Sequence, residues 1–131
     1  MPTPTLILIV DDDQAVRETL AHSLVNAEYQ ILKAANGKEA ITLAKEHHPD
    51  LILLDVKMPG LTGFETARIL QGDQQTSSIP ILFLTGEAKD VTSMEEGFDI
   101  GADDYLTKGQ STREILLRIS HTIRRHRQSH S

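Results

Sequence analysis

The feature that most constrains this chain of 131 residues is a regular alternation between short apolar runs and helical patterns. Three runs are continuously apolar, at residues 6–10 (LILIV), 51–54 (LILL) and 81–84 (ILFL), as is typical of strands covered on both faces. Two segments of mixed polarity, at 29–34 and 104–107, are weaker strand candidates that suit the sheet edges. This alternation predicts βαβ units around a mostly parallel sheet.

Apolar residues at helical spacing occupy the segments between these strands. The stripes are Val16, Leu20 and Leu24; Ala40, Leu43, Ala44 and His47; Val91, Met94 and Phe98; and Ile115, Ile119 and Ile123. We expect the first two stripes to face the sheet. A less regular helix is expected around residues 64–70, and Ser111 and Glu114 have the spacing of a capping box. Because a closed (β/α)₈ barrel needs about 250 residues, the sequence predicts one open α/β sandwich.

The composition excludes several classes of protein. Without cysteine, the chain cannot form a disulfide framework or a thiolate metal site. It has no apolar run near 18 residues and no basic, apolar leader, so we expect a cytoplasmic protein without a membrane segment. Residues 1–112 carry 8 basic and 18 acidic side chains, whereas residues 113–131 carry five arginines and one glutamate. This acidic body argues against direct nucleic-acid binding, except through the basic tail.

Polar side chains stand where the apolar runs end. They are Asp11, Asp12, Asp13, Asp55, Thr85 and Lys108. Ligands of open parallel sheets bind at the carboxyl ends of the strands, so we expect these groups around one pocket. Two carboxylates 4 Å apart repel by about 4 kcal/mol at an effective dielectric constant of 20. A small all-oxygen pocket of this kind suits Mg²⁺, although Asp13 is equally a candidate helix N-cap.

Asp55 is the candidate phosphoryl acceptor of this pocket. An aspartate carboxylate forms an acyl phosphate when a metal and a cation neutralise the transferring group. Asp55 ends a buried strand, which holds it rigidly, and we interpret Gly60 and Gly63 as leaving the approach to it sterically light. Thr85 and Lys108 are then expected to bind the phosphoryl oxygens.

Four motifs together resemble the receiver domain of two-component response regulators. They are ILIVDDD at 7–13, DLILLDVKMPGLTG at 50–63, PILFLTGEA at 80–88 and GADDYLTK at 101–108. The resemblance spans about residues 5–126 and implies a receiver domain at 1–126, with 127–131 as a basic C-terminal tail or the start of a linker. It also implies a flavodoxin-like (βα)₅ doubly wound sandwich with five parallel strands in the order 2-1-3-4-5.

The resemblance assigns roles by motif position. It implies that the metal ligands for Mg²⁺ are Asp11, Asp12, Asp55 and the backbone carbonyl of Lys57. Asp55 becomes the phosphoacceptor, with Thr85 and Lys108 beside it, and Thr85 and Tyr105 become the switch residues.

The implied reaction transfers a phosphoryl group to Asp55 from a phosphohistidine of a histidine kinase or histidine phosphotransfer protein. The output is an altered surface, read by a downstream effector protein or by an output domain missing from this chain. The domain would be no enzyme beyond its own phosphorylation and autodephosphorylation. Gly109 replaces the usual proline, so we expect a trans or looser loop after the fifth strand. Glu96 replaces a usual basic residue of the dimer face, so we expect a monomer or a weak phosphorylation-dependent dimer.

Three other functions stay open. An Asp-nucleophile phosphohydrolase also uses aspartate and Mg²⁺, although those enzymes resemble Asp-x-Asp and here Val56 and Lys57 follow Asp55. A flavodoxin-like FMN carrier shares the fold, although the acidic run at 11–13 would repel its phosphate. The third alternative is a receiver-like scaffold that is never phosphorylated.

Overall fold

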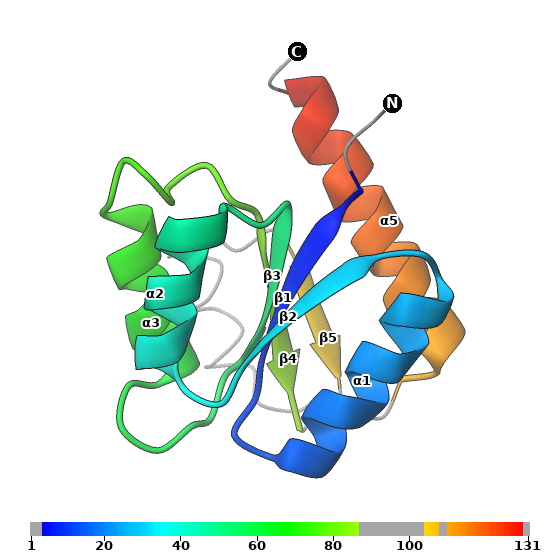
Figure 1. Ribbon diagram of the computed structural model, residues 1–131, viewed down its shortest axis with the longest axis horizontal. Helices are drawn as coiled ribbons and strands as arrows, with labels where there is room; N and C mark the ends of the chain where they lie inside the picture. Colours follow the sequence, from blue (N-terminus) through cyan, green and yellow to red (C-terminus); the bar gives the residue numbers. More distant parts are fainter. Residues whose placement is uncertain (1–3, 87–103, 108–109, 130–131) are drawn as a thin grey trace.

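Five strands form one parallel sheet in the computed structural model, which describes residues 4–86, 104–107 and 110–129 (Figure 1). The strands are β1 (Leu6–Val10), β2 (Gln30–Ala34), β3 (Leu51–Asp55), β4 (Ile81–Thr85) and β5 (Asp104–Thr107). Their order is β2-β1-β3-β4-β5, and every neighbouring pair is parallel. The predicted order is confirmed, and the two weaker strand candidates lie at the edges.

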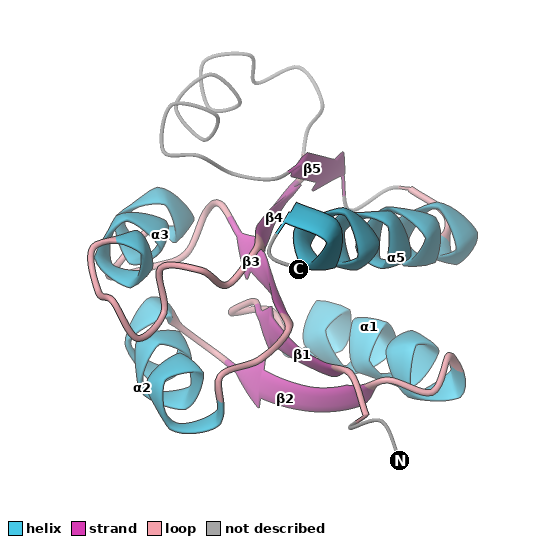
Figure 2. Ribbon diagram, turned by 90° about the horizontal axis from the view of Figure 1, so that it is seen from above, coloured by secondary structure: helices cyan, strands magenta, loops and turns pink. Residues whose placement is uncertain are grey.

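The helices cover the two faces of the sheet in pairs. They are α1 (Gln14–Asn26), α2 (Gly37–His47), α3 (Gly63–Gln71) and α5 (Thr112–Ser129). Figure 2 shows α2 and α3 on one face and α1 and α5 on the other. The stripe expected at 91–98 lies outside the described residues, and the expected boundary at residue 126 lies inside α5, so the end of the domain stays a prediction. Of the helices described, none has the length and apolar character that crossing a membrane requires.

Two of the three central strands, β3 and β4, continue one residue beyond their apolar runs. β3 ends with Asp55 and β4 ends with Thr85, and both of these polar residues are buried. The backbone N–H of Val56 donates to the carbonyl of Leu84 at 3.0 Å, so pairing between the two strands persists past Asp55. The sheet therefore holds these polar side chains in fixed directions.

Side-chain alternation divides the core into two clusters, one on each face of the sheet. On β4, Phe83 belongs to the cluster under α2 and α3, whereas Leu82 and Leu84 belong to the cluster under α1 and α5. The predicted α5 stripe of three isoleucines is buried in the second cluster. The spacing of apolar residues thus identified the packed face of α5.

The prediction that His47 faces the sheet is wrong. Its side chain is 46% exposed and its Nε2 lies 3.8 Å from Glu46 Oε2. The helix ends at His47 because His48 takes a left-handed conformation, with φ 48°, at the C-cap. His47 therefore lies in the final turn of α2, past the last side chains that this helix packs inward.

Two helices begin at residues that the sequence marks as turns or caps. The Asp13 carboxylate accepts hydrogen bonds from the N–H groups of Ala15 and Val16, so Asp13 is the N-cap of α1. The side-chain oxygen of Asn36 accepts from Glu39 N at 2.9 Å and caps α2. Both side chains satisfy amide groups that have no partner within the helix.

The complete capping box lies in α3 and not at Ser111. The Thr62 hydroxyl accepts from Glu65 N at 3.1 Å, and the Glu65 carboxylate accepts from Thr62 N at 3.0 Å. At α5, Ser111 Oγ accepts from Glu114 N at 3.2 Å, but the Glu114 carboxylate lies 3.5 Å from Gln110 Nε2 instead. The same Thr-x-x-Glu spacing is present at 62–65 in the sequence, where the prediction missed it.

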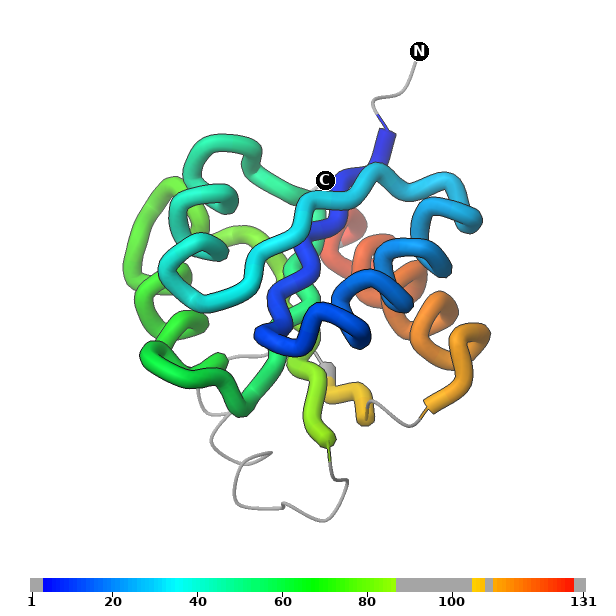
Figure 3. Tube along the Cα trace, turned by 60° about the horizontal axis from the view of Figure 1, so that its bottom comes forward, coloured from blue at the N-terminus to red at the C-terminus, as the bar shows by residue number. Residues whose placement is uncertain are grey.

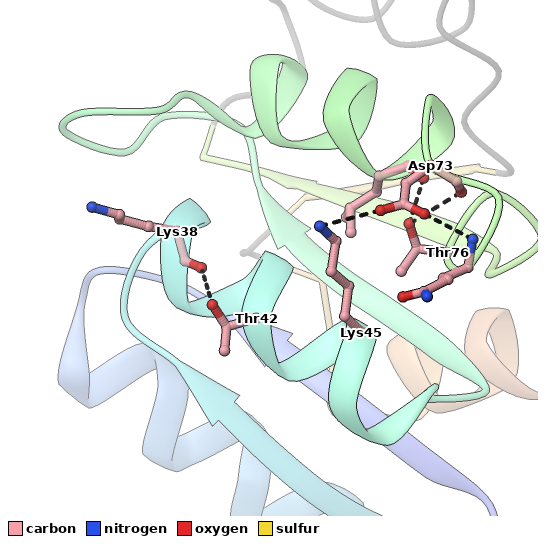
Figure 4. A network of polar contacts seen from close by, with 7 residues as sticks. Lys38, Thr42, Lys45, Asp73 and Thr76 are labelled. Carbon is pink, nitrogen blue, oxygen red and sulfur yellow. Dashed lines mark hydrogen bonds and ion pairs between the residues drawn. The ribbon is translucent and has the colours of Figure 1, made fainter.

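A polar network joins α2 to the turn after α3 (Figure 4). Lys45 Nζ lies 3.2 Å from an Asp73 carboxylate oxygen, and the other oxygen accepts from Gln75 N at 2.9 Å. These two contacts, the backbone hydrogen bond first, hold the pKa of Asp73 below its ordinary value. The Thr76 hydroxyl donates to the carbonyl of Leu70 at 2.6 Å and closes the turn that leads into β4.

Candidate functional site

Three carboxylates converge at the carboxyl edge of the sheet. Asp11 and Asp12 directly follow β1, and Asp55 ends β3, which pairs with β1 so that Val10 lies opposite Leu54. One carboxylate oxygen from each of these aspartates lies within 4.8 Å of the others. Asp11 and Asp55 are 0% and 2% exposed, whereas Asp12 is exposed to solvent. The predicted gathering of these three carboxylates at one edge of the sheet is thus present in the structure.

Backbone contacts fix the position of Asp11. Its N–H donates to the carbonyl of Ala34 at 3.2 Å, and its Oδ1 accepts from Asp13 N at 3.0 Å. Arg17, one turn into α1, donates from Nη1 to the Asp11 carbonyl at 2.7 Å. Arg17 was not predicted from the sequence. Its hydrogen bond fixes the backbone at Asp11 and places a guanidinium group close to the carboxylates.

Gly63 has a different role from the one expected. A β-carbon at this position would overlap the Asp55 carbonyl oxygen and lie 2.9 Å from Val56 Cα. Gly63 N also donates to the Val56 carbonyl at 2.9 Å. Gly63 therefore lets the first turn of α3 pack against the backbone of Asp55, and it does not widen the approach. Gly60 supplies the open turn, because its φ is 78° and no atom lies within 4 Å of the place that a β-carbon would take.

The arrangement of the cluster suits a cation. Unit charges at about 4 Å repel by about 4 kcal/mol at an effective dielectric constant of 20, and burial of two carboxylates weakens solvent screening. Oxygen donors gathered at one point are the ligand set that hard divalent cations prefer. By donor chemistry, Asp11, Asp12 and Asp55 therefore fit a divalent ion such as Mg²⁺.

Asp55 and Thr85 end neighbouring strands. Asp55 lies opposite Leu84 in the ladder between β3 and β4, so Thr85 comes one position beyond it, and Thr85 is 6% exposed. Lys57 N donates to Asp55 Oδ1 at 3.3 Å, which directs this carboxylate toward the loop after β3. The Lys57 side chain is exposed. A hydroxyl and a carboxylate thus stand at one edge of the sheet.

A row of three aromatic rings lies beneath Thr85. Phe83 is two residues earlier on β4 and so points to the same face. The Tyr105 ring, 7% exposed, stacks on Phe83 with centroids 5.3 Å apart, and Phe64 of α3 meets Phe83 edge-on at 4.9 Å. Sequence reading identified Tyr105 but missed the row, because its members come from three separate elements.

The structure does not describe three residues of the predictions above. They are Lys108 of the predicted site, Gly109 after it and Glu96 of the predicted dimer face. Among the described residues, the structure unites Asp11, Asp12 and Asp55 in one cluster and places Thr85 at the end of the next strand.

The sheet order and the acidic cluster after β1 and β3 define an α/β domain of the receiver type. Residues 7–120 match the model of the response regulator receiver domain family. The chain belongs to this family, whose members are the receivers of two-component signalling systems.

Two curated relatives are similar to this chain along most of its length. The phosphate regulon transcriptional regulatory protein PhoB of Pseudomonas aeruginosa is 43% identical over 119 residues, which cover 91% of this chain and 52% of PhoB. The response regulator MprA of Mycolicibacterium vanbaalenii is 45% identical over 124 residues, covering 93% of this chain and 52% of MprA. The chain thus spans about half the length of these relatives.

A solved structure shares the whole fold. The chemotaxis protein CheY4 of Vibrio cholerae superposes with a TM-score of 0.86 at 32% sequence identity, over 92% of this chain and 99% of CheY4. The match covers nearly all of both chains, so it confirms the flavodoxin-like architecture.

Proposed function

We propose that this receiver accepts a phosphoryl group on Asp55 from a phosphohistidine of a histidine kinase or histidine phosphotransfer protein. The observation that carries the proposal is the convergence of Asp55 with Asp11 and Asp12 at the end of a buried strand. This geometry gives a fixed carboxylate nucleophile and a set of oxygen ligands for a counter-cation. Membership of the family agrees with it.

The transfer forms one bond to phosphorus and breaks another. A carboxylate oxygen of Asp55 attacks the phosphorus, the bond from phosphorus to the histidine nitrogen breaks, and the imidazole leaves with a proton from solvent. Water later attacks the acyl phosphate, which returns the Asp55 carboxylate and releases inorganic phosphate. Asp11, Asp12, Asp55 and the backbone carbonyl of Lys57 would hold Mg²⁺, which neutralises phosphoryl oxygens when bound.

Thr85 and Lys108 are proposed to bind the phosphoryl oxygens, with Thr85 donating its hydroxyl and Lys108 its ammonium. Thr85 ends the strand beside Asp55, which supports this role. Movement of Thr85 toward Asp55 would change the space above the aromatic row, and Tyr105 would follow. The switch would then alter the surface near β5.

The output is proposed to be a protein contact. The chain spans about half the length of relatives that are transcriptional regulatory proteins, so an effector protein or an output domain would read the surface. We propose a receiver at 1–126 with a basic tail or linker at 127–131, acting as a monomer or a weak phosphorylation-dependent dimer. Its only catalysis would be its own phosphorylation and dephosphorylation.

Binding of beryllofluoride, a stable mimic of the phosphoryl group, tests this proposal. The protein with Mg²⁺ should show saturable NMR shift changes on adding beryllofluoride, and acetyl phosphate should add one phosphoryl group by intact mass. Asp55→Asn should abolish both. Asp13→Asn is the matched control, because Asp13 is a helix cap outside the cluster and asparagine also caps helices.

Uptake of phosphoryl by Asp55→Asn as fast as by the unchanged protein would place the acceptor elsewhere. Steady turnover of a small phosphate ester that depends on Asp55 would instead favour the phosphohydrolase alternative.

A further inference from the structure

The edge of the sheet opposite the acidic cluster carries a second concave site. The amino ends of the strands meet there, and the last turns of α5 run beside the start of β1 (Figures 1 and 3). An open pocket of about 370 Å³ lies between them. Its polar lining consists of Thr5, Tyr29, Ser120, Arg124, Arg127 and Gln128.

The lining comes from separate parts of the chain. Ser120, Arg124 and Arg127 recur at intervals of four and three residues, so they share one face of α5. Thr5 precedes β1, and Tyr29 precedes β2. The pocket is therefore lined by polar residues from three segments of the chain and not by a row of arginines along one helix.

One of the two guanidinium groups is held in place. Arg127 Nη2 lies 3.3 Å from Thr5 Oγ1 and 3.8 Å from Asp50 Oδ1. Asp50 is itself fixed, because its Oδ2 accepts from Leu6 N at 2.8 Å. These contacts use few of the five N–H donors of a guanidinium, so Arg127 is oriented and keeps donors for a ligand.

The other guanidinium, Arg124, makes no side-chain hydrogen bond or ion pair in the part of the chain that the structure describes. None of the described residues that line the pocket is acidic. Asp50 offsets part of the charge of Arg127 but not that of Arg124. The pocket therefore combines about one uncompensated positive charge with the hydroxyl groups of Thr5, Tyr29 and Ser120.

We propose that this pocket binds an oxyanion of the phosphate class, as free phosphate or as the phosphate of a small monoester. Guanidinium groups bind phosphate oxygens through paired, charge-assisted hydrogen bonds, and the hydroxyls supply further donors. The volume is in the range of small-ligand sites. A nucleic-acid backbone fits less well, because residues 1–112 carry 18 acidic side chains against 8 basic ones. The site is separate from Asp55 and does not depend on its phosphorylation.

NMR titration of the full chain with sodium phosphate tests the proposal, in EDTA and at constant ionic strength balanced with sodium chloride. We expect saturable shift changes at the amides of Thr5, Tyr29 and the last two turns of α5. Arg124→Gln should weaken the affinity about tenfold or more, since it removes a charged hydrogen-bond donor. Arg113→Gln, on α5 but outside the pocket, is the control and should change the affinity less than about twofold.

A second titration with O-phosphoserine separates the two sources of phosphate. Tighter binding of O-phosphoserine than of inorganic phosphate would indicate a small monoester, and equal binding would indicate the free ion. Chemical shifts that grow linearly with phosphate, without saturating, would overturn the proposal. An equal loss of affinity in Arg113→Gln and Arg124→Gln would also overturn it. Either result would mean that phosphate acts only through general charge screening. The Arg124 side chain makes no hydrogen bond or ion pair with the residues that the structure describes, so we expect Arg124→Gln to fold normally. Loss of phosphate binding in this variant can then be compared directly with the unchanged protein.

Discussion

Gly63 lies against the backbone of Asp55 so closely that a β-carbon on Gly63 would overlap the Asp55 carbonyl oxygen. The first turn of α3 is thereby packed directly behind the proposed phosphoacceptor. Any side chain at this position must push α3 or the end of β3 aside.

Gly63→Ala should therefore weaken both the fold and phosphoryl uptake. We expect a loss of about 1–3 kcal/mol in the free energy of unfolding, typical of overpacking, and slower labelling by acetyl phosphate. Urea unfolding and intact mass measure the two effects. Gly72→Ala is the control, since a β-carbon there would make a tight contact of 3.3 Å with the Arg68 carbonyl but no overlap, and it lies at the far end of α3. It should lose less stability than Gly63→Ala and should be labelled at the normal rate. If acetyl phosphate labels Gly63→Ala at the normal rate, the close packing of Gly63 against Asp55 is not needed for phosphoryl uptake.

Asp12→Asn should change both the stability of the protein without Mg²⁺ and the gain in stability that Mg²⁺ produces. Without the ion, removal of one of three clustered charges should stabilise the protein slightly, by less than about 1 kcal/mol because Asp12 is exposed. With the ion, the variant should gain less stability than the unchanged protein, because a ligand at free concentration L stabilises the folded state by RT ln(1 + L/Kd), which falls as the affinity falls. Thermal unfolding with EDTA and with millimolar Mg²⁺ measures both. Equal stabilisation by Mg²⁺ would exclude Asp12 as a ligand.

Phe83 and Tyr105 should be energetically coupled. Their rings stack with centroids 5.3 Å apart, and such pairs contribute about 0.5–1.5 kcal/mol beyond the area that they bury. A double-mutant cycle with Phe83→Leu and Tyr105→Leu, read by urea unfolding, measures this energy. Ile119→Val on the opposite face of the sheet should combine additively with Phe83→Leu, within about 0.5 kcal/mol. A coupling no larger than in that control pair would mean that the rings only fill space.

Glu65 should make stability depend on pH through its capping box. The backbone N–H of Thr62, and then its hydroxyl, hold the pKa of Glu65 below the ordinary value of 4.5. The folded state therefore prefers the ionised carboxylate, so this stabilisation is complete above pH 4.5 and is lost as the pH falls through the lower folded pKa. Glu65→Gln should flatten the pH dependence of unfolding in this acidic range. An unchanged slope would contradict the assignment.

The central strands could be predicted because buried parallel strands are continuous apolar runs, and the boundaries of β1 agree with the pattern. Asp55 and its cluster could be predicted because strand ends of a parallel sheet share one edge. The role of Arg17 could not be predicted. Its hydrogen bond to the Asp11 carbonyl spans six residues, and the apolar pattern of the sequence does not encode the path of the loop between them. The packing behind Asp55 was misread for a related reason: a glycine in a sequence does not reveal what approaches it.

The contact between Thr5 and Arg127 spans 122 positions of the chain. A ribosome releases residues in order, so β1 and β3 emerge long before α5, which is one of the two helices on this face of the sheet. Until α5 arrives, Ile7 and Ile9 lack the isoleucines that bury them in the finished protein. Nascent chains of this domain should therefore carry a sheet face covered only by α1 until α5 is made, which is the stage at which chaperone binding or aggregation competes with folding.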